Sequence, residues 1–262
     1  MIILRPWLAL VLFAGAAARA ATPSYSATGF RNACDLASGP FAPNTVVSIY
    51  GSGLAWSTLG LTADDVRGGS LPTTLNGVEV AVDGAPTPLF LVSDSQINFL
   101  MPTNQIAGPV TIRVIREGTV GPEVSLTLLD AAPALFASPT APGYAIAQQW
   151  PDYSTITPSA PAHPGGIVIL YAAGLGRTSP YPSQSTEIPA YAGVLQAMTD
   201  FHVYLDGKPL DSAKVLYAGL APGWSGLYQV NLVLPGDAGP DPEIRLAIGA
   251  QMSAPGIKLA VQ

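Results

Sequence analysis

Few residues of this sequence have the types and spacing that acid–base or nucleophilic catalysis needs. The two histidines lie apart, His163 in a proline-rich segment and His202 at the start of an expected strand. The text nearest to a nucleophile elbow is Gly223-Trp224-Ser225-Gly226, which has the wrong spacing and no following helix. We therefore expect neither a Ser-His-Asp triad nor any enzymatic activity.

Metal and nucleotide motifs are also weak. The acidic clusters, Asp64-Asp65 and residues 237–243, do not match an EF-hand, and Pro240 and Pro242 interrupt the second one. We interpret both as solvated turn carboxylates. Gly174-x-Gly176 follows an expected strand but lacks the third glycine of a dinucleotide loop. The prediction is therefore no metal site and no cofactor.

Aromatic side chains outside the repeated blocks described below are the best candidates for binding. Tyrosine and tryptophan give large contact areas at low entropic cost, so exposed examples mark protein or sugar contacts. The alternative is that they cover the ends of the domains as minor cores. The candidates are Trp56, Trp150, Tyr153, Tyr181 and Trp224, with Tyr191 near Tyr181.

Composition limits what scaffold can hold these residues. The chain of 262 residues has 27 glycines and 26 prolines, 48% apolar residues and only 11% charged ones. So many helix breakers exclude coiled coils and helix bundles, and the apolar share is enough to bury a core. The net charge of −6 excludes a nucleic-acid partner held by electrostatics.

Residues 1–20 have the pattern of a cleaved signal peptide. Arg5 precedes an apolar stretch from residue 7 to 18, and Ala18-Arg19-Ala20 forms the cleavage signal. We expect an exported protein, extracellular, on the cell surface or periplasmic, with no membrane span after cleavage. Cys34, the single cysteine, cannot form an intrachain disulfide. It is either a small buried apolar residue or a reactive or intermolecular thiol, and we favour the first.

The rest of the chain consists of two copies of one repeat unit. Three blocks recur in the same order: 45–54 with 166–175, 78–86 with 201–209, and 95–102 with 228–235. Each half then closes with another alternating run, at 109–115 and 242–248. The copies differ most at 55–70 and 218–226, and loops that differ between matched copies are where we expect individual function.

Each copy is predicted to be a β-sandwich. Short runs rich in Val, Ile, Thr and Phe alternate with turn residues, and Ile97 and Phe99 are expected to face one way and Asn98 the other. Asp83-Gly84 and Asp206-Gly207 are strong hairpin signals. The predicted fold is all-β, with two tandem immunoglobulin-like β-sandwich domains after the signal peptide. We place the first at 21–136, a proline-rich junction at 137–164 and the second at 165–262.

One repeated polar pattern lies inside the expected strands. Gln96 and Asn98 match Gln229 and Asn231. These amides either face a ligand or satisfy neighbouring backbone groups, and their recurrence in both copies favours the structural interpretation.

The repeated blocks resemble a known family. Segments such as TVVSIYGSGLA, DSQINFLMP and YAGLAPGWSGLYQVNLVLP are similar to the Solibacter-type uncharacterised C-terminal domains of exported acidobacterial proteins, from about Phe30 to Gln262. The resemblance implies an extracellular all-β module related to IPT/TIG and other Ig-like domains, without established catalysis. Cys34-Asp35 departs from the small Ala-Ser type pair common there.

We therefore expect a non-enzymatic tandem Ig-like module for adhesion, assembly or protein interaction. The alternative is a carbohydrate-binding module that uses the loop aromatics. The expected partner is an unknown protein or a glycan.

Overall fold

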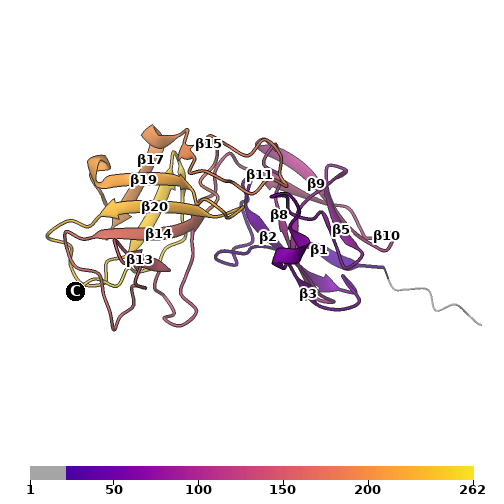
Figure 1. Ribbon diagram of the computed structural model, residues 1–262, viewed down its shortest axis with the longest axis horizontal. Helices are drawn as coiled ribbons and strands as arrows, with labels where there is room; N and C mark the ends of the chain where they lie inside the picture. Colours follow the sequence, from indigo (N-terminus) through magenta and orange to yellow (C-terminus); the bar gives the residue numbers. More distant parts are fainter. Residues whose placement is uncertain (1–21) are drawn as a thin grey trace, which may run out of the picture.

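The computed structural model describes residues 22–262, which form two β-sandwiches in succession (Figure 1). The strands of the first are β1 (Ser24–Asn32), β2 (Val46–Ser52), β3 (Leu59–Gly60), β4 (Thr74–Leu75), β5 (Val78–Val82), β6 (Ala85–Pro86), β7 (Leu89–Val92), β8 (Gln96–Leu100), β9 (Gly108–Arg116), β10 (Thr119–Val120) and β11 (Val124–Leu128). One 3-10 turn, η1 (Ala63–Asp65), interrupts them. Sheet 1 has the order β1-β2-β8-β7-β3, and sheet 2 has the order β10-β9-β5-β4 with β11 on β9 and β6 on β5.

The second sandwich repeats this plan. Its strands are β12 (Ala134–Leu135), β13 (Ala147–Gln149), β14 (Ile167–Ala173), β15 (Thr178–Ser179), β16 (Val194–Leu195), β17 (Phe201–Leu205), β18 (Lys208–Pro209), β19 (Val215–Leu220), β20 (Tyr228–Val233), β21 (Ile244–Ile248) and β22 (Gln251–Met252). The 3-10 turns η2 (Met198–Asp200) and η3 (Ser212–Lys214) flank β17 and β19. Sheet 3 has the order β12-β14-β20-β19-β16-β15 with β13 on β14, and sheet 4 the order β18-β17-β21-β22.

Each sandwich has its own apolar core. One cluster of buried side chains draws only on residues from Tyr25 to Leu128, and the other only on residues from Ala131 to Val261. Within residues 22–262, neighbouring strands of the four sheets pair in the antiparallel direction, as β5 with β9 and β17 with β21. The predicted all-β class with two tandem Ig-like sandwiches is confirmed. The expected signal peptide, residues 1–20, lies outside the described residues.

The segment between the two matched halves contributes to the second sandwich. β12 and β13, which bracket residues 136–146, both pair with β14. Residues 162 and 261 form a parallel bridge that also ties this segment to the C-terminal end of the chain. The proline-rich stretch is therefore held by strand pairing, while its exact bounds as a junction stay a prediction.

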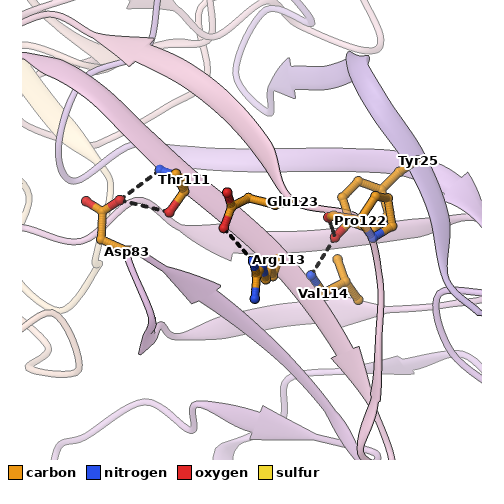
Figure 2. A network of polar contacts seen from close by, with 7 residues as sticks. All are labelled: Tyr25, Asp83, Thr111, Arg113, Val114, Pro122 and Glu123. Carbon is orange, nitrogen blue, oxygen red and sulfur yellow. Dashed lines mark hydrogen bonds and ion pairs between the residues drawn. The ribbon is translucent and has the colours of Figure 1, made fainter.

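Local sequence explains the strand faces and the hairpins. Ile97 and Phe99 are fully buried and Asn98 is half-buried on the other face of β8, as the alternation predicts. Asp83 and Gly84 have φ values of 49° and 79°, the left-handed conformation that a tight two-residue hairpin requires. The Asp83 carboxylate then accepts hydrogen bonds from the Thr111 backbone N–H at 2.8 Å and from its hydroxyl (Figure 2), which ties the hairpin to β9.

Tyr25 joins the two sheets of the first sandwich. Its ring belongs to β1, and its hydroxyl accepts a hydrogen bond from the Val114 N–H at 2.7 Å and donates one to the Pro122 carbonyl at 2.6 Å (Figure 2). Val114 lies where β10 ends and β11 begins along β9, so this N–H has no strand partner there. A Cβ on Gly121 would come within 2.8 Å of the Tyr25 ring, so this position has room only for glycine.

Replacing Tyr25 with phenylalanine should destabilise the first sandwich. The change leaves the buried Val114 N–H without an acceptor, and an unsatisfied buried donor costs about 1–3 kcal/mol. The free energy of unfolding, measured by urea titration, should fall by that amount. Tyr204→Phe is the matched control, because the Tyr204 hydroxyl forms no hydrogen bond with any of residues 22–262, and it should change stability by less than about 0.5 kcal/mol. Equal effects of the two substitutions would contradict the role assigned to Tyr25.

Candidate functional site

The two sandwiches contact each other through a long loop of the second one. We call residues 180–193, which connect β15 to β16, the strap. Its Thr186 carbonyl accepts a hydrogen bond from the Leu71 N–H at 2.8 Å, and its Ile188 N–H donates to the Gly69 carbonyl at 3.1 Å. Ser70 and Glu187 thus form an antiparallel bridge. Figure 1 shows the loop that follows β15 reaching across to the first sandwich.

A side-chain contact supports the strap at a second place. The Ser185 hydroxyl accepts a hydrogen bond from the Thr103 N–H at 3.0 Å and lies 3.4 Å from the Thr103 hydroxyl. Close by in sequence, the Arg177 guanidinium donates to the Gln105 carbonyl at 3.1 Å. The strap is therefore anchored to two separate segments of the first sandwich.

The hairpin loop between β19 and β20 supplies the rest of the junction. Gly226 has φ +80° and lies so close to Val46 and Leu100 that a Cβ would meet their side chains at 2.8 and 3.1 Å. The buried Asn44 side chain donates to the Tyr228 hydroxyl at 3.4 Å, and that hydroxyl donates to the Gly176 carbonyl at 2.6 Å. The segments where the copies differ, around 70 and 226, thus contact the opposite domain.

Tyr181 lines a small cleft beside the strap. The cleft has a volume of about 100 Å³, and Tyr191, Glu187 and Leu220 contribute to its walls together with three prolines. Burial raises the pKa of Tyr181 to about 12, although Arg177 opposes this shift. The guanidinium of Arg177 lies 5.6 Å from the centre of the Tyr181 ring. The Tyr181 hydroxyl is buried beside the Tyr228 hydroxyl, which lowers the pKa of Tyr181 by less than burial raises it.

Trp224 is the most exposed tryptophan of the described residues, at 66%. It follows Gly223, whose N–H donates to the Pro189 carbonyl of the strap at 2.7 Å. Ser225, on its other side, donates to the Glu187 carbonyl at 3.3 Å. The structure therefore brings the predicted residues Tyr181 and Trp224 to the same strap, together with Tyr191, which is 78% exposed.

Trp150 and Tyr153 form a second aromatic surface on the second sandwich. Their ring centres are 5.4 Å apart with the planes at 79°, an edge-to-face pair. The Gln148 amide donates to the Tyr153 carbonyl at 2.9 Å, and the Tyr171 hydroxyl donates to the Gln148 side-chain oxygen at 2.5 Å. Both rings remain about half exposed, so they do not form a minor core.

Trp56 is separate from these surfaces and has a structural contact. Its ring lies over the guanidinium of Arg116, 3.8 Å from the ring centre, and its indole N–H donates to the Glu117 carboxylate at 3.0 Å. Arg116 is 1% exposed, and it also donates to the Gly53 carbonyl. A desolvated cation on an aromatic face contributes about 2 kcal/mol. Trp56 therefore stabilises the buried Arg116 side chain and covers the end of β9.

The duplicated amides do not satisfy backbone groups. In the first sandwich the Gln96 amide N–H donates to the Asn98 side-chain oxygen at 2.8 Å, and Gln229 donates to Asn231 in the same way at 2.8 Å. Ser48 adds a hydrogen bond to the Asn98 oxygen, also at 2.8 Å. All of these partners are side chains on the outer faces of sheets 1 and 3, where the amides are partly exposed and Ser48 is buried, whereas the sequence favours backbone partners.

Cys34 lies at the junction and is not set up as a nucleophile. Burial raises the pKa of its thiol well above the ordinary value, Asp35 raises it further, and the Ala173 backbone amide of the second sandwich offsets only part of this. A thiolate is the reactive form, so this environment suppresses reactivity.

Residues 22–262 contain no cluster of metal-ligating side chains. No group of three or more His, Cys, Asp or Glu side chains there could hold a metal ion. Within the same range, no helix is long and apolar enough to cross a membrane.

The fold and these surfaces define a tandem Ig-like β-sandwich protein. Residues 34–128 match the family model of the IPT/TIG domain, which covers most of the first sandwich. No curated protein sequence matches the chain.

Three solved structures illustrate the structural likeness. The glucan-utilisation protein SGBP-B of Bacteroides ovatus, solved with a mixed-linkage heptasaccharide, is 9% identical, with 85% of this chain and 43% of that chain covered and a TM-score of 0.30. The titin I9–I11 tandem is 10% identical over 84% and 61%, with a TM-score of 0.24. Domains 5–6 of the S-layer protein SbsC are 10% identical over 91% and 98%, with a TM-score of 0.23. The chain thus spans less than two thirds of the first two proteins.

Replacing strap residues 184–188 with a Gly-Ser sequence should release the two sandwiches from each other. The change keeps the main-chain groups that bond Gly69 and Leu71 but raises the entropic cost of ordering them, and it displaces the Ser185 hydroxyl that accepts from Thr103, while neither apolar core includes residues 184–188. Small-angle scattering should show a larger radius of gyration and a flexible pair of bodies, with the strand content unchanged by circular dichroism. A scattering curve identical to that of the wild type would show that the strap does not fix the junction.

Alkaline pH should weaken the fold through the junction tyrosines. Burial raises the pKa of Tyr181 to about 12 and that of Tyr228 well above its ordinary value, so the folded state keeps both protonated while the unfolded chain ionises near pH 10. Their contribution to stability is complete below about pH 10 and is lost as the pH rises from there towards 12. Tm measured across this range should fall, and Tyr181→Phe should reduce the fall. An unchanged slope in this variant would contradict the assignment.

Proposed function

We propose that the chain is an exported, non-enzymatic tandem Ig-like module for adhesion, assembly or protein interaction. The observation that carries this proposal is the use of the divergent loops. The strap and the β19–β20 loop bind the first sandwich, and they leave Trp224 and Tyr191 exposed beside the junction. A fixed pair of domains with exposed aromatic side chains at its centre suits recognition of a partner, because aromatic anchors dominate binding energy.

The titratable groups support a non-enzymatic role. The charged groups beside the Tyr181 cleft are Glu187 and Arg177. The Glu187 carboxylate already accepts hydrogen bonds from the Ser183 N–H and hydroxyl, each at 3.0 Å, and the Arg177 side chain donates to Gln105. The Glu187 carboxylate is thus engaged within the strap, and Arg177 is engaged across the junction. The resemblance to Solibacter-type exported domains, and the leader-like residues 1–20, support export and a place at the cell surface or beyond it.

Carbohydrate binding through loop aromatics is the second candidate function. It is favoured by the Trp150–Tyr153 pair, which is half exposed and lies next to the amide of Gln148. The two rings meet edge to face, so they offer two differently oriented apolar surfaces rather than one flat stacking platform.

Binding to envelopes of the source organism tests the first function. Labelled mature chain should bind saturably, and unlabelled chain should compete with it. Trp224→Ala should weaken binding by about 30-fold, because truncating a central aromatic anchor costs ~2 kcal/mol. Val120→Ala is the control, since Val120 is an exposed apolar residue on β10 and not on the strap. Loss of binding in the control alone, or no saturable binding by the wild type, would contradict the proposal.

A further inference from the structure

The outer faces of sheets 1 and 3 carry the same three side chains at the same places. On each face, a tyrosine of one strand lies opposite a glutamine of the neighbouring strand. An asparagine follows two residues after that glutamine, so it lies on the same side of the sheet. We call each set a Tyr-Gln-Asn face. The members are Tyr50, Gln96 and Asn98 in the first sandwich, and Tyr171, Gln229 and Asn231 in the second.

The amide pair on each face is oriented by its own hydrogen bond. Since the Gln N–H donates to the Asn oxygen at 2.8 Å in both copies, the Gln oxygen and the Asn N–H₂ are left to face other partners. None of the described residues bonds those two free groups. Each face therefore presents one acceptor and one donor side by side, held in a fixed orientation.

The strands that carry these faces are stabilised by the side chains on their inner side, which pack in the apolar cores. Ile97 and Phe99 of β8, and Val230 and Leu232 of β20, are fully buried in the two cores. The outward amides Gln96, Asn98, Gln229 and Asn231 are partly exposed, although their register neighbours Ser48 and Ile169 are buried. Their retention as the same amides in both copies, with no bond to the backbone, indicates a use on the solvent side.

Each face lies in the middle of its sheet. β2 and β8 are flanked by β1 and β7, and β14 and β20 by β12, β13 and β19 (Figure 1). No strand edge is free there, so a peptide cannot add as a further strand. A ligand must instead lie across the side chains.

The three members of each Tyr-Gln-Asn face are uncharged, and Arg31 is a charged neighbour of the first face. Asn231 has Ile169 and Tyr217 as its neighbours in register. Asn98 has Ser48 and Leu91, and beyond Ser48 lies Arg31, which donates to backbone carbonyls of its own strand. A net charge of −6 also repels anionic polymers.

We propose that each Tyr-Gln-Asn face is a subsite for a neutral polysaccharide. Adjacent hydroxyls of a sugar ring each donate and accept, which matches the paired acceptor and donor, and the tyrosine ring offers an apolar surface to the ring carbons. Tyr50 is 39% exposed, and Tyr171 joins the face of the second sandwich to Gln148 and the Trp150–Tyr153 pair. The inference rests on the proposed adhesive role and names its ligand class.

The junction makes two subsites act together. The strap holds both faces on one body, so a repeating polymer that occupies one face meets the other at a high effective concentration. Linking two sites in this way raises overall affinity by about 10²–10⁴ when the geometry allows both to bind. A short oligosaccharide that reaches one face gains nothing from this.

Affinity electrophoresis of the mature chain in gels that contain single polysaccharides tests the proposal. The panel holds neutral glucans, mannans, xylans and galactans, with alginate as the anionic member. At least one neutral polymer should retard the wild type. Removing one amide pair, by Gln96→Ala with Asn98→Ala or by Gln229→Ala with Asn231→Ala, should weaken retardation at least tenfold, and removing both pairs should abolish it. Gln251→Ala on β22, at the edge of sheet 4, is the matched control and should bind like the wild type.

The other outcomes overturn the proposal. These are no retardation by any neutral polymer, retardation by alginate alone, or retardation that persists without both amide pairs. Retardation that is lost only with Trp150→Ala assigns the site to the loop aromatics instead. Circular dichroism and Tm of each variant show that loss of binding is not unfolding. Saturable binding to envelopes by a chain that no polysaccharide retards would leave the proposed function standing while this inference fails.

Discussion

Two main-chain hydrogen bonds, between residues 69–71 of the first sandwich and 186–188 of the second, set the relation between the two halves of this protein. Backbone pairing is directional, so it fixes orientation in a way that apolar contact alone does not. The Thr103–Ser185 contact and the packing of Gly226 on Val46 and Leu100 depend on the same placement. The same pairing holds the strap, with the aromatic side chains around Trp224, beside the first sandwich.

Without a disulfide, packing and hydrogen bonding must stabilise each sandwich. The two cores are separate. Side-chain hydrogen bonds satisfy backbone N–H groups where the pairing between strands is interrupted. Tyr25 does so at the gap between β10 and β11, and the Asp83 carboxylate does so beside its hairpin. In the second copy Asp206 repeats the latter contact by accepting from the Glu243 N–H at 2.9 Å. The two copies thus share this hydrogen bond from the hairpin aspartate as well as the apolar pattern of the strands.

Much of the fold follows from the sequence, and the limits have physical causes. Period-two alternation predicts which side of β8 is buried, and Asp-Gly pairs predict the hairpins, since both depend on neighbouring residues. The same alternation, extended along β9 from Val110 through Ile112 and Val114, places Arg116 on the buried side, a signal that we did not use. A buried Arg116 also implies a partner for its guanidinium, which the Trp56 ring provides. Differences between the copies locate the variable loops, but a contact between residues 70 and 187 depends on how two domains dock, which no local pattern encodes. The sequence shows the amide pairs as a repeat, but the hydrogen-bond partner of an amide depends on side-chain conformations that no sequence pattern encodes.

The position of the strap in the duplicated unit has a consequence for assembly. The strap and the segment around Ser70 both fall between the first two repeated blocks, so the two copies use corresponding loops to hold each other. Because the contact joins the corresponding loops of the two copies, both loops are engaged in it. The main-chain groups of Gly69, Leu71, Thr186 and Ile188 that form this joint are therefore not available to a further copy of the unit at the same place.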